Sequence, residues 1–160
     1  MKGVAKATLI SIVVTIALFM FTSFINFFPW YTTLIVETFN ISQIVAGDNY
    51  LKESYHVDAL ARLKSRPIFE EYSNEIEIKV ETEDGKKGIG IDDETAYETS
   101  VDQDKPYRQR GHTITVELSA VYPLKITIWG KTYVRKINMP FTMKTVGLKH
   151  YKDLDYYTIK

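Results

Sequence analysis

The most prominent pattern in the chain is one long apolar run close to its N-terminus. Residues 7–36 contain no charged side chain, and the only charged side chains before them are Lys2 and Lys6. A helix rises about 1.5 Å per residue and the hydrocarbon core of a bilayer is about 30 Å thick, so about 20 apolar residues can cross it. The run therefore predicts a membrane-anchoring helix, with these anchor residues: Leu9, Ile12, Ile16, Phe19, Phe24, Phe28 and Trp30.

The flanks of the run predict how this helix is placed. Trp30 and Tyr31 are residue types that prefer the headgroup level of a membrane, and Pro29 predicts a kink or break beside them. Lys2 and Lys6 favour a cytoplasmic N-terminus. A cleaved signal peptide is the alternative, but its apolar region is usually about 7–15 residues long and ends in small residues. We expect residues 1–31 to be an uncleaved single-pass anchor in the cell membrane, with residues 32–160 outside the cell.

A helical period continues beyond the anchor and then gives way to other elements. Leu34, Thr38, Ile41 and Val45 recur at spacings of three to four residues, which predicts an amphipathic helix that continues the anchor until residues 47–48 end it. A second, short helix is predicted to begin with Asp58 as its N-cap and to end before residue 67, which is a proline.

A period of two then predicts antiparallel strands. Apolar and polar residues alternate in three segments, 75–81, 112–128 and 132–145, and Pro123 predicts an edge or a bulge in the second of them. Residues 88–91 are predicted to form a short returning strand after a turn at residues 84–85, and residues 130–131 to form a second turn. Residues 92–111 are polar and are predicted to form a long loop.

Together these elements predict an α+β fold, in which a long N-terminal transmembrane helix extends into a small antiparallel β-sheet domain. The exported helix has an apolar stripe, and the sheet has an apolar face with no other long helix to cover it, so we expect the two to pack together. The residues expected at this contact are Leu34, Ile41, Val45, Val116, Leu118, Met139 and Phe141.

Composition excludes some classes of function. Lys and Arg together number 20 and so do Asp and Glu, so the chain lacks the basic excess that nucleic-acid binding requires. The chain has no cysteine, which excludes disulfides and thiolate metal sites. The three histidines are far apart, and no nucleophile motif or phosphate-binding loop is present. We therefore expect no enzyme activity, no cofactor and no metal.

Two polar clusters leave alternatives open. The acidic residues of the 92–111 loop could bind calcium, but they lack the spacing of a calcium-binding loop and are more simply read as a solvated loop. Arg108, Arg110 and His112 could pair within the molecule or contact a partner, and the intramolecular reading is favoured.

The helix-then-sheet plan is similar to that of pilins. The apolar segment 9–29, the helical segment 32–46 and the two last strands, 114–123 and 136–142, resemble the TadE-like minor pseudopilins and related small proteins of secretion and conjugation clusters. Precursors of this type are usually cut after a Gly and carry Glu at the fifth mature position. Here Gly3 is available, but Thr8 occupies that position and the first acidic residue is Glu37.

The resemblance implies a non-enzymatic, membrane-anchored structural subunit of a secretion, pilus or conjugation apparatus. Its partners would be the membrane and other subunits of the assembly, with oligomerisation through the N-terminal helix. The alternative is a membrane-anchored extracellular binding or sensor module, which the long 92–111 loop motivates because loops of that length in compact domains are often functional.

Overall fold

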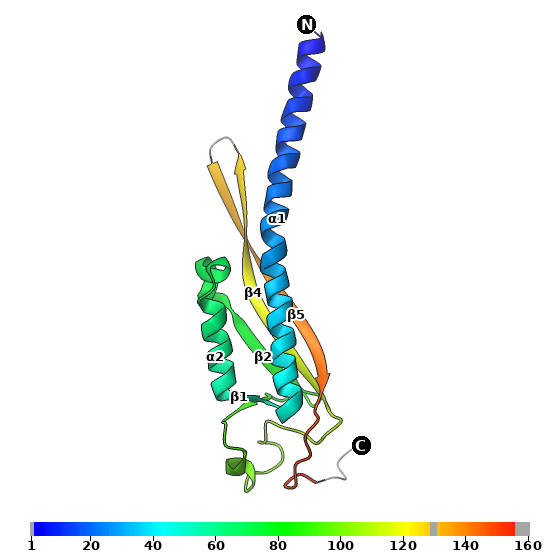
Figure 1. Cartoon of the computed structure of the whole chain (residues 1–160), viewed down its shortest axis with the longest axis vertical. Helices are drawn as coiled ribbons and strands as arrows, with labels where there is room; N and C mark the ends of the chain where they lie inside the picture. Colours follow the sequence, from blue (N-terminus) through cyan, green and yellow to red (C-terminus); the bar gives the residue numbers. More distant parts are fainter. Residues whose placement is uncertain (1, 129–130, 156–160) are drawn as a thin grey trace.

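The computed structural model describes residues 2–128 and 131–155, except for the side chains of residues 2, 20, 23, 24, 127 and 128. It is a mixed α+β structure in which one very long helix, α1 (Lys2–Asp48), lies against a small antiparallel sheet (Figure 1). The remaining elements in chain order are β1 (Leu51–Lys52), α2 (Glu53–Lys64), the 3₁₀ segment η1 (Pro67–Glu75), β2 (Glu77–Thr82), β3 (Ile89–Gly90), the 3₁₀ turn η2 (Glu94–Tyr97), β4 (Thr113–Ile128) and β5 (Lys131–Val146).

α1 is continuous over 47 residues, with Pro29 inside it. Of the kink or break predicted at Pro29, the break is therefore wrong. A proline removes its own N–H bond to the carbonyl one turn earlier and its ring crowds that carbonyl, but the packing of the next turns against the domain holds the helix together. The helix ends at Asp48, where Asn49 adopts a left-handed conformation with φ of 62°. Asn is the residue after Gly that tolerates this conformation best.

The main sheet has the strand order β2-β4-β5, and both pairings are antiparallel. β2 has six residues, whereas β4 and β5 have 16 each, so the β4–β5 hairpin continues well beyond the sheet's third strand. Pro123 lies within β4, opposite Lys136, in the part that β2 does not reach. No ladder bond is required of Pro123 on that side, which is why the strand continues through it. The predicted turn at residues 130–131 falls partly outside the described residues.

The short strand after β2 differs from its prediction. Gly88 donates its backbone N–H to the Val80 carbonyl at 2.7 Å, so the chain does return along β2. Residues 89–90 then leave β2 and pair with β1 in parallel, Leu51 opposite Ile89. The second helix differs as well, because α2 begins at Glu53 and Asp58 lies inside it, paired with Arg62 one turn later.

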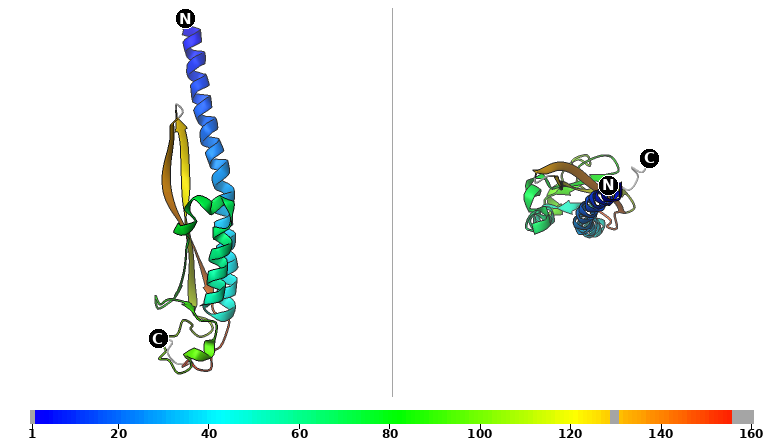
Figure 2. Two further views of the ribbon diagram at one scale, coloured as in Figure 1. Left: turned by 90° about the vertical axis from the view of Figure 1, so that its left-hand side faces the viewer. Right: turned by 90° about the horizontal axis from the view of Figure 1, so that it is seen from above.

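The molecule has two layers, with α1 and α2 on one face of the sheet (Figure 2). Alternate residues of β2 and β4 point into this interface, where they form one apolar cluster with α1, α2 and η1. The opposite face of β2 is exposed and charged, with Glu77, Lys79 and Glu81. This alternation is the expected consequence of a sheet with one wet face.

The contact between α1 and the sheet predicts how the domain responds to truncation. Full burial of each Leu, Ile or Val side chain contributes about 1.5–3 kcal/mol, so loss of the α1 stripe removes a large part of a small core. A fragment of residues 50–160 should be poorly folded, whereas a fragment of residues 30–160 should unfold cooperatively in urea when followed by circular dichroism. Equal stability of the two fragments would show that the sheet does not depend on α1.

Candidate functional site

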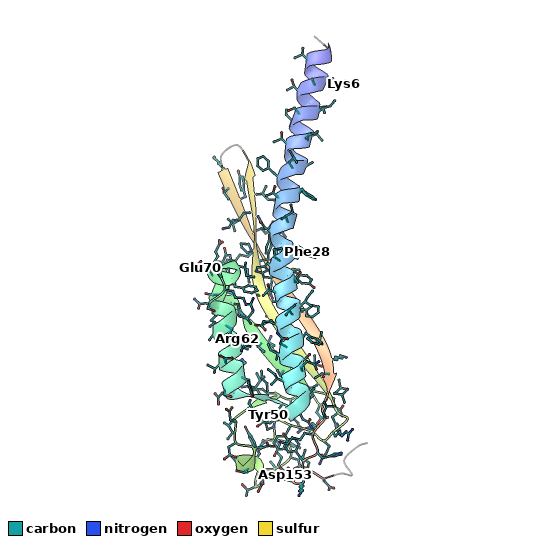
Figure 3. The ribbon with its side chains drawn as sticks, viewed as in Figure 1. Lys6, Phe28, Tyr50, Arg62, Glu70 and Asp153 are labelled. Atoms are coloured by element: carbon teal, nitrogen blue, oxygen red, sulfur yellow. The ribbon has the colours of Figure 1, made fainter. Side chains whose placement is uncertain are left out.

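The N-terminal half of α1 extends away from the domain, and its apolar side chains radiate on all sides between Lys6 and Phe28 (Figure 3). We call residues 3–28 the exposed segment. Leu9 and Phe28 are each 65% exposed, and Ile12, Ile16 and Phe19 are exposed to a similar degree. The side chain of Phe24 lies outside the described residues. Six of the seven predicted anchor residues have described side chains. Five of them are exposed, and the sixth, Trp30, is not.

The hydroxyl groups of the exposed segment bond to the helix itself. Thr8, Thr15 and Thr22 each donate to the carbonyl oxygen four residues earlier, at 2.8–3.0 Å. A hydroxyl bonded in this way needs no water, so these residues are compatible with an apolar surrounding. Along the described residues, no helix combines the length and hydropathy that crossing a membrane would require.

Trp30 is the predicted anchor residue that the structure places differently. Its side chain is 2% exposed and lies in the core, with ring centroids 5.4 Å from Phe69 and 5.2 Å from Tyr122. Phe27 is also 5.0 Å from Tyr122. The interface role expected for Trp30 is therefore corrected. The aromatic residues where α1 meets the domain form one cluster on the sheet side of the helix. We call this cluster the collar, and it comprises Phe27, Trp30, Tyr31, Phe69, Tyr122 and Phe141.

The seven residues predicted for the helix–sheet contact all belong to one cluster. Leu34, Ile41 and Val45 are fully buried on α1, and Val116 and Leu118 are fully buried on β4. Met139 and Phe141 of β5 are partly buried against the same cluster. Ser42 of α1 also contacts the sheet, since its hydroxyl donates to the Met143 sulfur at 3.1 Å.

A buried carboxylate joins α1 to α2. Glu37 is 4% exposed and lies 3.8 Å from Arg62 and 3.4 Å from Arg66, with Asn40 donating to it at 3.3 Å. The two arginine side chains are about half exposed, so they keep part of their hydration while they neutralise Glu37. These contacts link α1 to Arg62 of α2 and to Arg66, which follows α2.

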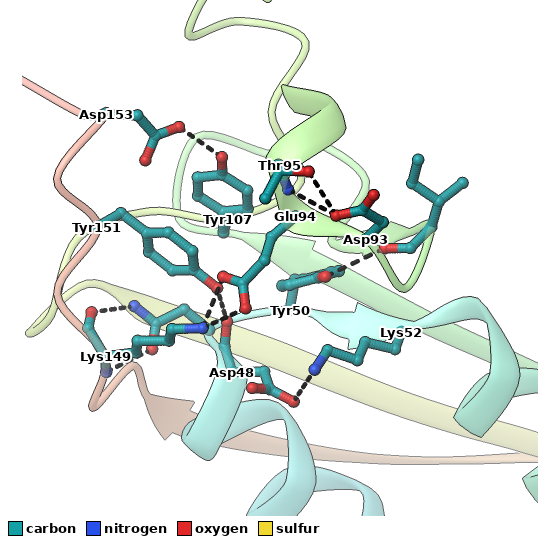
Figure 4. Close-up of polar contacts among 12 residues, drawn as sticks. Asp48, Tyr50, Lys52, Asp93, Glu94, Thr95, Tyr107, Lys149, Tyr151 and Asp153 are labelled. Atoms are coloured by element: carbon teal, nitrogen blue, oxygen red, sulfur yellow. Dashed lines mark hydrogen bonds and ion pairs between the residues drawn. The ribbon is translucent and has the colours of Figure 1, made fainter. Parts of the chain in front are cut away.

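The end of α1 is fixed by a second, tyrosine-rich cluster that we call the base cluster (Figure 4). The rings of Tyr107 and Tyr151 stack at 3.8 Å between centroids. Tyr107 donates to the Asp153 carboxylate and Tyr151 donates to the Asp48 carbonyl, both at 2.6 Å. Tyr50 donates to the Ile91 carbonyl at 3.1 Å. The 92–111 loop is thereby packed against the C-terminal tail and the end of α1.

The protonation states in the base cluster suit a structural role. Burial raises the pKa of Tyr50, Tyr107 and Tyr151, and nearby carboxylates raise it further, so the hydroxyls stay protonated as donors. Burial alone would lower the pKa of Lys105, but the carboxylates of Asp102 and Asp153 outweigh it and raise that pKa.

The end of α1 is also tied to the tail through Asn49. Its side-chain amide donates to the carbonyls of Arg108 and Lys149, and its oxygen accepts the Lys149 N–H. A Cβ on Gly147 would lie 2.7 Å from the Asn49 side chain, so the tail needs glycine at this crossing. The carbonyl of Ala46, which the end of the helix leaves without a helical partner, accepts the Leu148 N–H.

The basic cluster pairs within the molecule. Arg108 is buried and donates to Asp84 at 2.8 Å and to the carbonyls of Lys105 and Tyr107, while His112 pairs with Glu83. Arg110 remains exposed. Sequence reasoning identified the cluster but not its acceptors, since Asp84 and Glu83 belong to a turn far away in the chain.

Two observations bear on the metal and ligand alternatives for the 92–111 loop. Within the part of the chain that the structure describes, no three His, Cys, Asp or Glu side chains converge. A shallow groove of about 540 Å³ lies between α2 and β2, and its lining runs from His56 and Leu60 to Ile89 without any residue of the 92–111 loop. Comparison of the chain with protein-family models, with curated proteins and with solved structures gives no match.

The Glu37 tie predicts an asymmetric response to substitution. Arg62→Met together with Arg66→Met leaves a buried carboxylate without its cations, which should cost about 1–3 kcal/mol after allowance for the exposed arginines. Glu37→Gln leaves only exposed cations behind and should cost less than the double arginine change. Urea unfolding of the detergent-solubilised chain compares the two variants, and an equal or larger cost for Glu37→Gln would contradict this account.

The Asp84–Arg108 pair predicts a dependence of stability on pH. The hydrogen bond from Arg108 lowers the pKa of Asp84 below its usual value of 3.8. A carboxyl whose pKa is depressed in the folded state stabilises it above the unfolded pKa, and this stabilisation is lost as the pH falls through the folded pKa. Asp84→Asn should therefore lower the stability at pH 7 and weaken its decline below about pH 4.

Urea unfolding between pH 7 and pH 3 measures this effect. Glu81→Gln, at an exposed position on the wet face of β2, is the matched control. The same acid dependence in Asp84→Asn as in the unchanged chain would show that other carboxylates carry it.

Proposed function

We propose that the protein is a non-enzymatic, membrane-anchored structural subunit, pseudopilin-like, of a secretion, pilus or conjugation apparatus. The observation that carries the proposal is the division of α1 into two halves. The C-terminal half lies buried against a sheet, whereas the exposed segment leaves the domain with apolar side chains on every side. A monomeric domain in water gains nothing from such a segment.

The cover of the exposed segment is proposed to be membrane lipid together with helices of neighbouring subunits. The absence of charge from residue 7 to residue 36 and the internally bonded threonines support an apolar surrounding. Lys2 and Lys6 place the N-terminus in the cytoplasm in this proposal, with the α+β domain outside.

The packing of the domain supports a structural role over a binding role. The side chains of the 92–111 loop that are buried, such as Tyr107 and Arg108, bond to other parts of the same chain. The groove beside α2 is lined by residues of α2, β2 and the following turn. The tyrosine hydroxyls of the base cluster already have partners within the protein, as buried polar groups in a folded domain normally do.

The proposal predicts contact between α1 helices of neighbouring subunits along one face. Small residues let helices approach closely, and Ser11 and Thr15 share a face of α1 whereas Val13 lies on the opposite side. Since the chain has no cysteine, single substitutions introduce the only thiol. Ser11→Cys and Thr15→Cys should form disulfide-linked dimers in membranes under mild oxidation, and Val13→Cys should form several-fold fewer.

Fractionation of the same membranes tests the anchor separately. The full chain should stay with the lipid after an alkaline wash. A chain released by that wash would contradict the anchor, and equal cross-linking at all three positions would contradict a specific helix contact.

A further inference from the structure

The β4–β5 hairpin projects past the rest of the sheet. β2 pairs with β4 only from Ile114 to Ser119, whereas the pairing of β4 with β5 continues to Ile128. We call residues 123–128 and 131–136 the hairpin tip. The tip extends as a two-stranded ribbon, away from the end of the domain that holds the base cluster (Figure 1).

The tip runs beside the exposed segment of α1 in both side views (Figures 1 and 2). Tyr122 contacts Phe27 and Trp30 in the collar, and Ile128 lies six residues further along β4. At about 3.3 Å per strand residue this is about 20 Å, or roughly 13 residues of helix, which brings the end of the hairpin level with the region of Thr15.

This overlap limits how much of α1 can enter a membrane without the tip. From residue 3 to the level of the hairpin's end, α1 is roughly 18 Å long, whereas the hydrocarbon core of a bilayer is about 30 Å thick. If α1 crosses the membrane, about 12 Å of the hairpin lies within the hydrocarbon of the outer leaflet. This corresponds to about three residues of each strand, and we call residues 126–128 and 131–133 the entering part.

The composition of the tip fits contact with lipid. Ile126, Tyr133 and Val134 are 47–60% exposed, so apolar surface is available at the end that enters. Tyr is also a residue type that prefers the interface of a membrane. The chain has no acidic residue between Glu117 and Asp153, so the tip brings no carboxylate into the membrane.

Two cations of the tip remain for lipid phosphates. Lys125 and Lys136 pair with carboxylates of η1, whereas Lys131 and Arg135 form no ion pair with a residue that the structure describes. Arg135 follows the entering part and lies at the level of the headgroups. Lys131 lies deeper, but the stem of a lysine can pass through apolar surroundings and bring its ammonium group toward the headgroups.

The backbone of the entering part has few groups that lipid would leave unpaired. An open sheet edge is costly in hydrocarbon, because its N–H and C=O groups find no water there. These groups alternate between the two edges of a strand, and Thr82 of β2 directs its N–H outward, to the Lys86 carbonyl. By the register from β2 to β5, only residues 127 and 132 of the entering part direct theirs outward.

We propose that the hairpin tip inserts into the outer leaflet of the membrane that α1 crosses, with lipid around the entering part and lipid phosphates bound by Lys131 and Arg135. The inference rests on the proposed function, because it requires that α1 crosses the membrane. A second insertion beside α1 restricts the tilt of the domain, since tilting away from that side would pull the entering part out of the lipid.

Depth-dependent quenching in vesicles tests the insertion. The chain has no cysteine, so one substitution supplies a single site for an environment-sensitive fluorophore. Tyr133→Cys places it in the entering part, and Val101→Cys, on the exposed loop at the far end of the domain, is the control. The full chain is reconstituted in vesicles of phosphatidylcholine and phosphatidylglycerol, at a dilution at which most occupied vesicles hold one chain.

Two quenchers then report what covers each label. Lipids with a nitroxide on the upper part of the acyl chain should quench the label at residue 133 several-fold more than the label at residue 101. Aqueous iodide should quench the two labels in the opposite order. A label at residue 133 that iodide reaches as easily as the control would overturn the inference.

Charge reversal tests the phosphate contacts. Lys131→Glu with Arg135→Glu, in the chain labelled at residue 133, should reduce quenching by the nitroxide lipid several-fold, because carboxylates then face phosphates and hydrocarbon. Lys79→Glu on the wet face of β2 is the matched control and should leave the quenching unchanged. Reversal without loss would contradict the role of the two cations.

Flotation of the same vesicles after an alkaline wash separates the two proposals. If the chain floats with the lipid while the label at residue 133 stays open to iodide, the insertion of the hairpin is wrong and the anchor stands. If the chain does not float, both are wrong. A label that is shielded from iodide but not quenched by the nitroxide lipid would show that protein covers the tip, which would also overturn the inference.

Discussion

Leu34, Ile41 and Val45 of α1 are withdrawn from solvent against β4 and β5, and the remaining structure depends on this contact. The sheet has three strands and one apolar face, and this face has to be buried against another element. The helix is equally unable to keep its stripe in water. Once the two meet, α2 and η1 close the side of the same core, and Glu37 ties α1 to the arginines there.

Two groups of contacts, one aromatic and one largely polar, then fix the position of α1 along its own axis. The collar around Trp30 holds it where it leaves the domain, and the base cluster holds its C-terminus through Asn49 and the Asp48 carbonyl. Between these points the buried stripe prevents rotation, because a small turn would expose Leu34 or Ile41. These contacts therefore set the direction in which the exposed segment of α1 leaves the domain.

The alternating strands and the α1 stripe could be predicted from the sequence, because periodicity directly reports which side of an element is buried. The pattern of Ile76, Ile78 and Val80 correctly indicated a half-buried strand, although β2 begins at Glu77. The position of Trp30 could not be predicted, since residue type alone does not distinguish a membrane interface from an aromatic core. The collar exists only because Phe69 and Tyr122, distant in the chain, come to the same place.

The parallel β1–β3 pair and the base cluster could not be predicted from the sequence either. Two-residue strands have no period to detect, and the acceptors of the tyrosine hydroxyls are backbone carbonyls or a distant Asp153. The continuity of α1 through Pro29 could not be predicted for a related reason. A proline indicates what a segment disfavours locally, whereas the packing of the surrounding turns decides what the chain adopts. Pro123 does lie on an edge, in the part of β4 that β2 does not reach, as its residue type predicted.

The long separation in sequence between α1 and its cover has a consequence for biosynthesis. The helix leaves the ribosome first, but β4 and β5, which bury its stripe, are translated more than sixty residues later. A nascent chain thus carries an uncovered apolar helix throughout the synthesis of α2, η1 and β2. Contacts of such sequence separation form slowly, and exposed apolar surface in that interval promotes aggregation. Early capture of the helix by a targeting factor or a membrane would protect the chain until its own hairpin is complete.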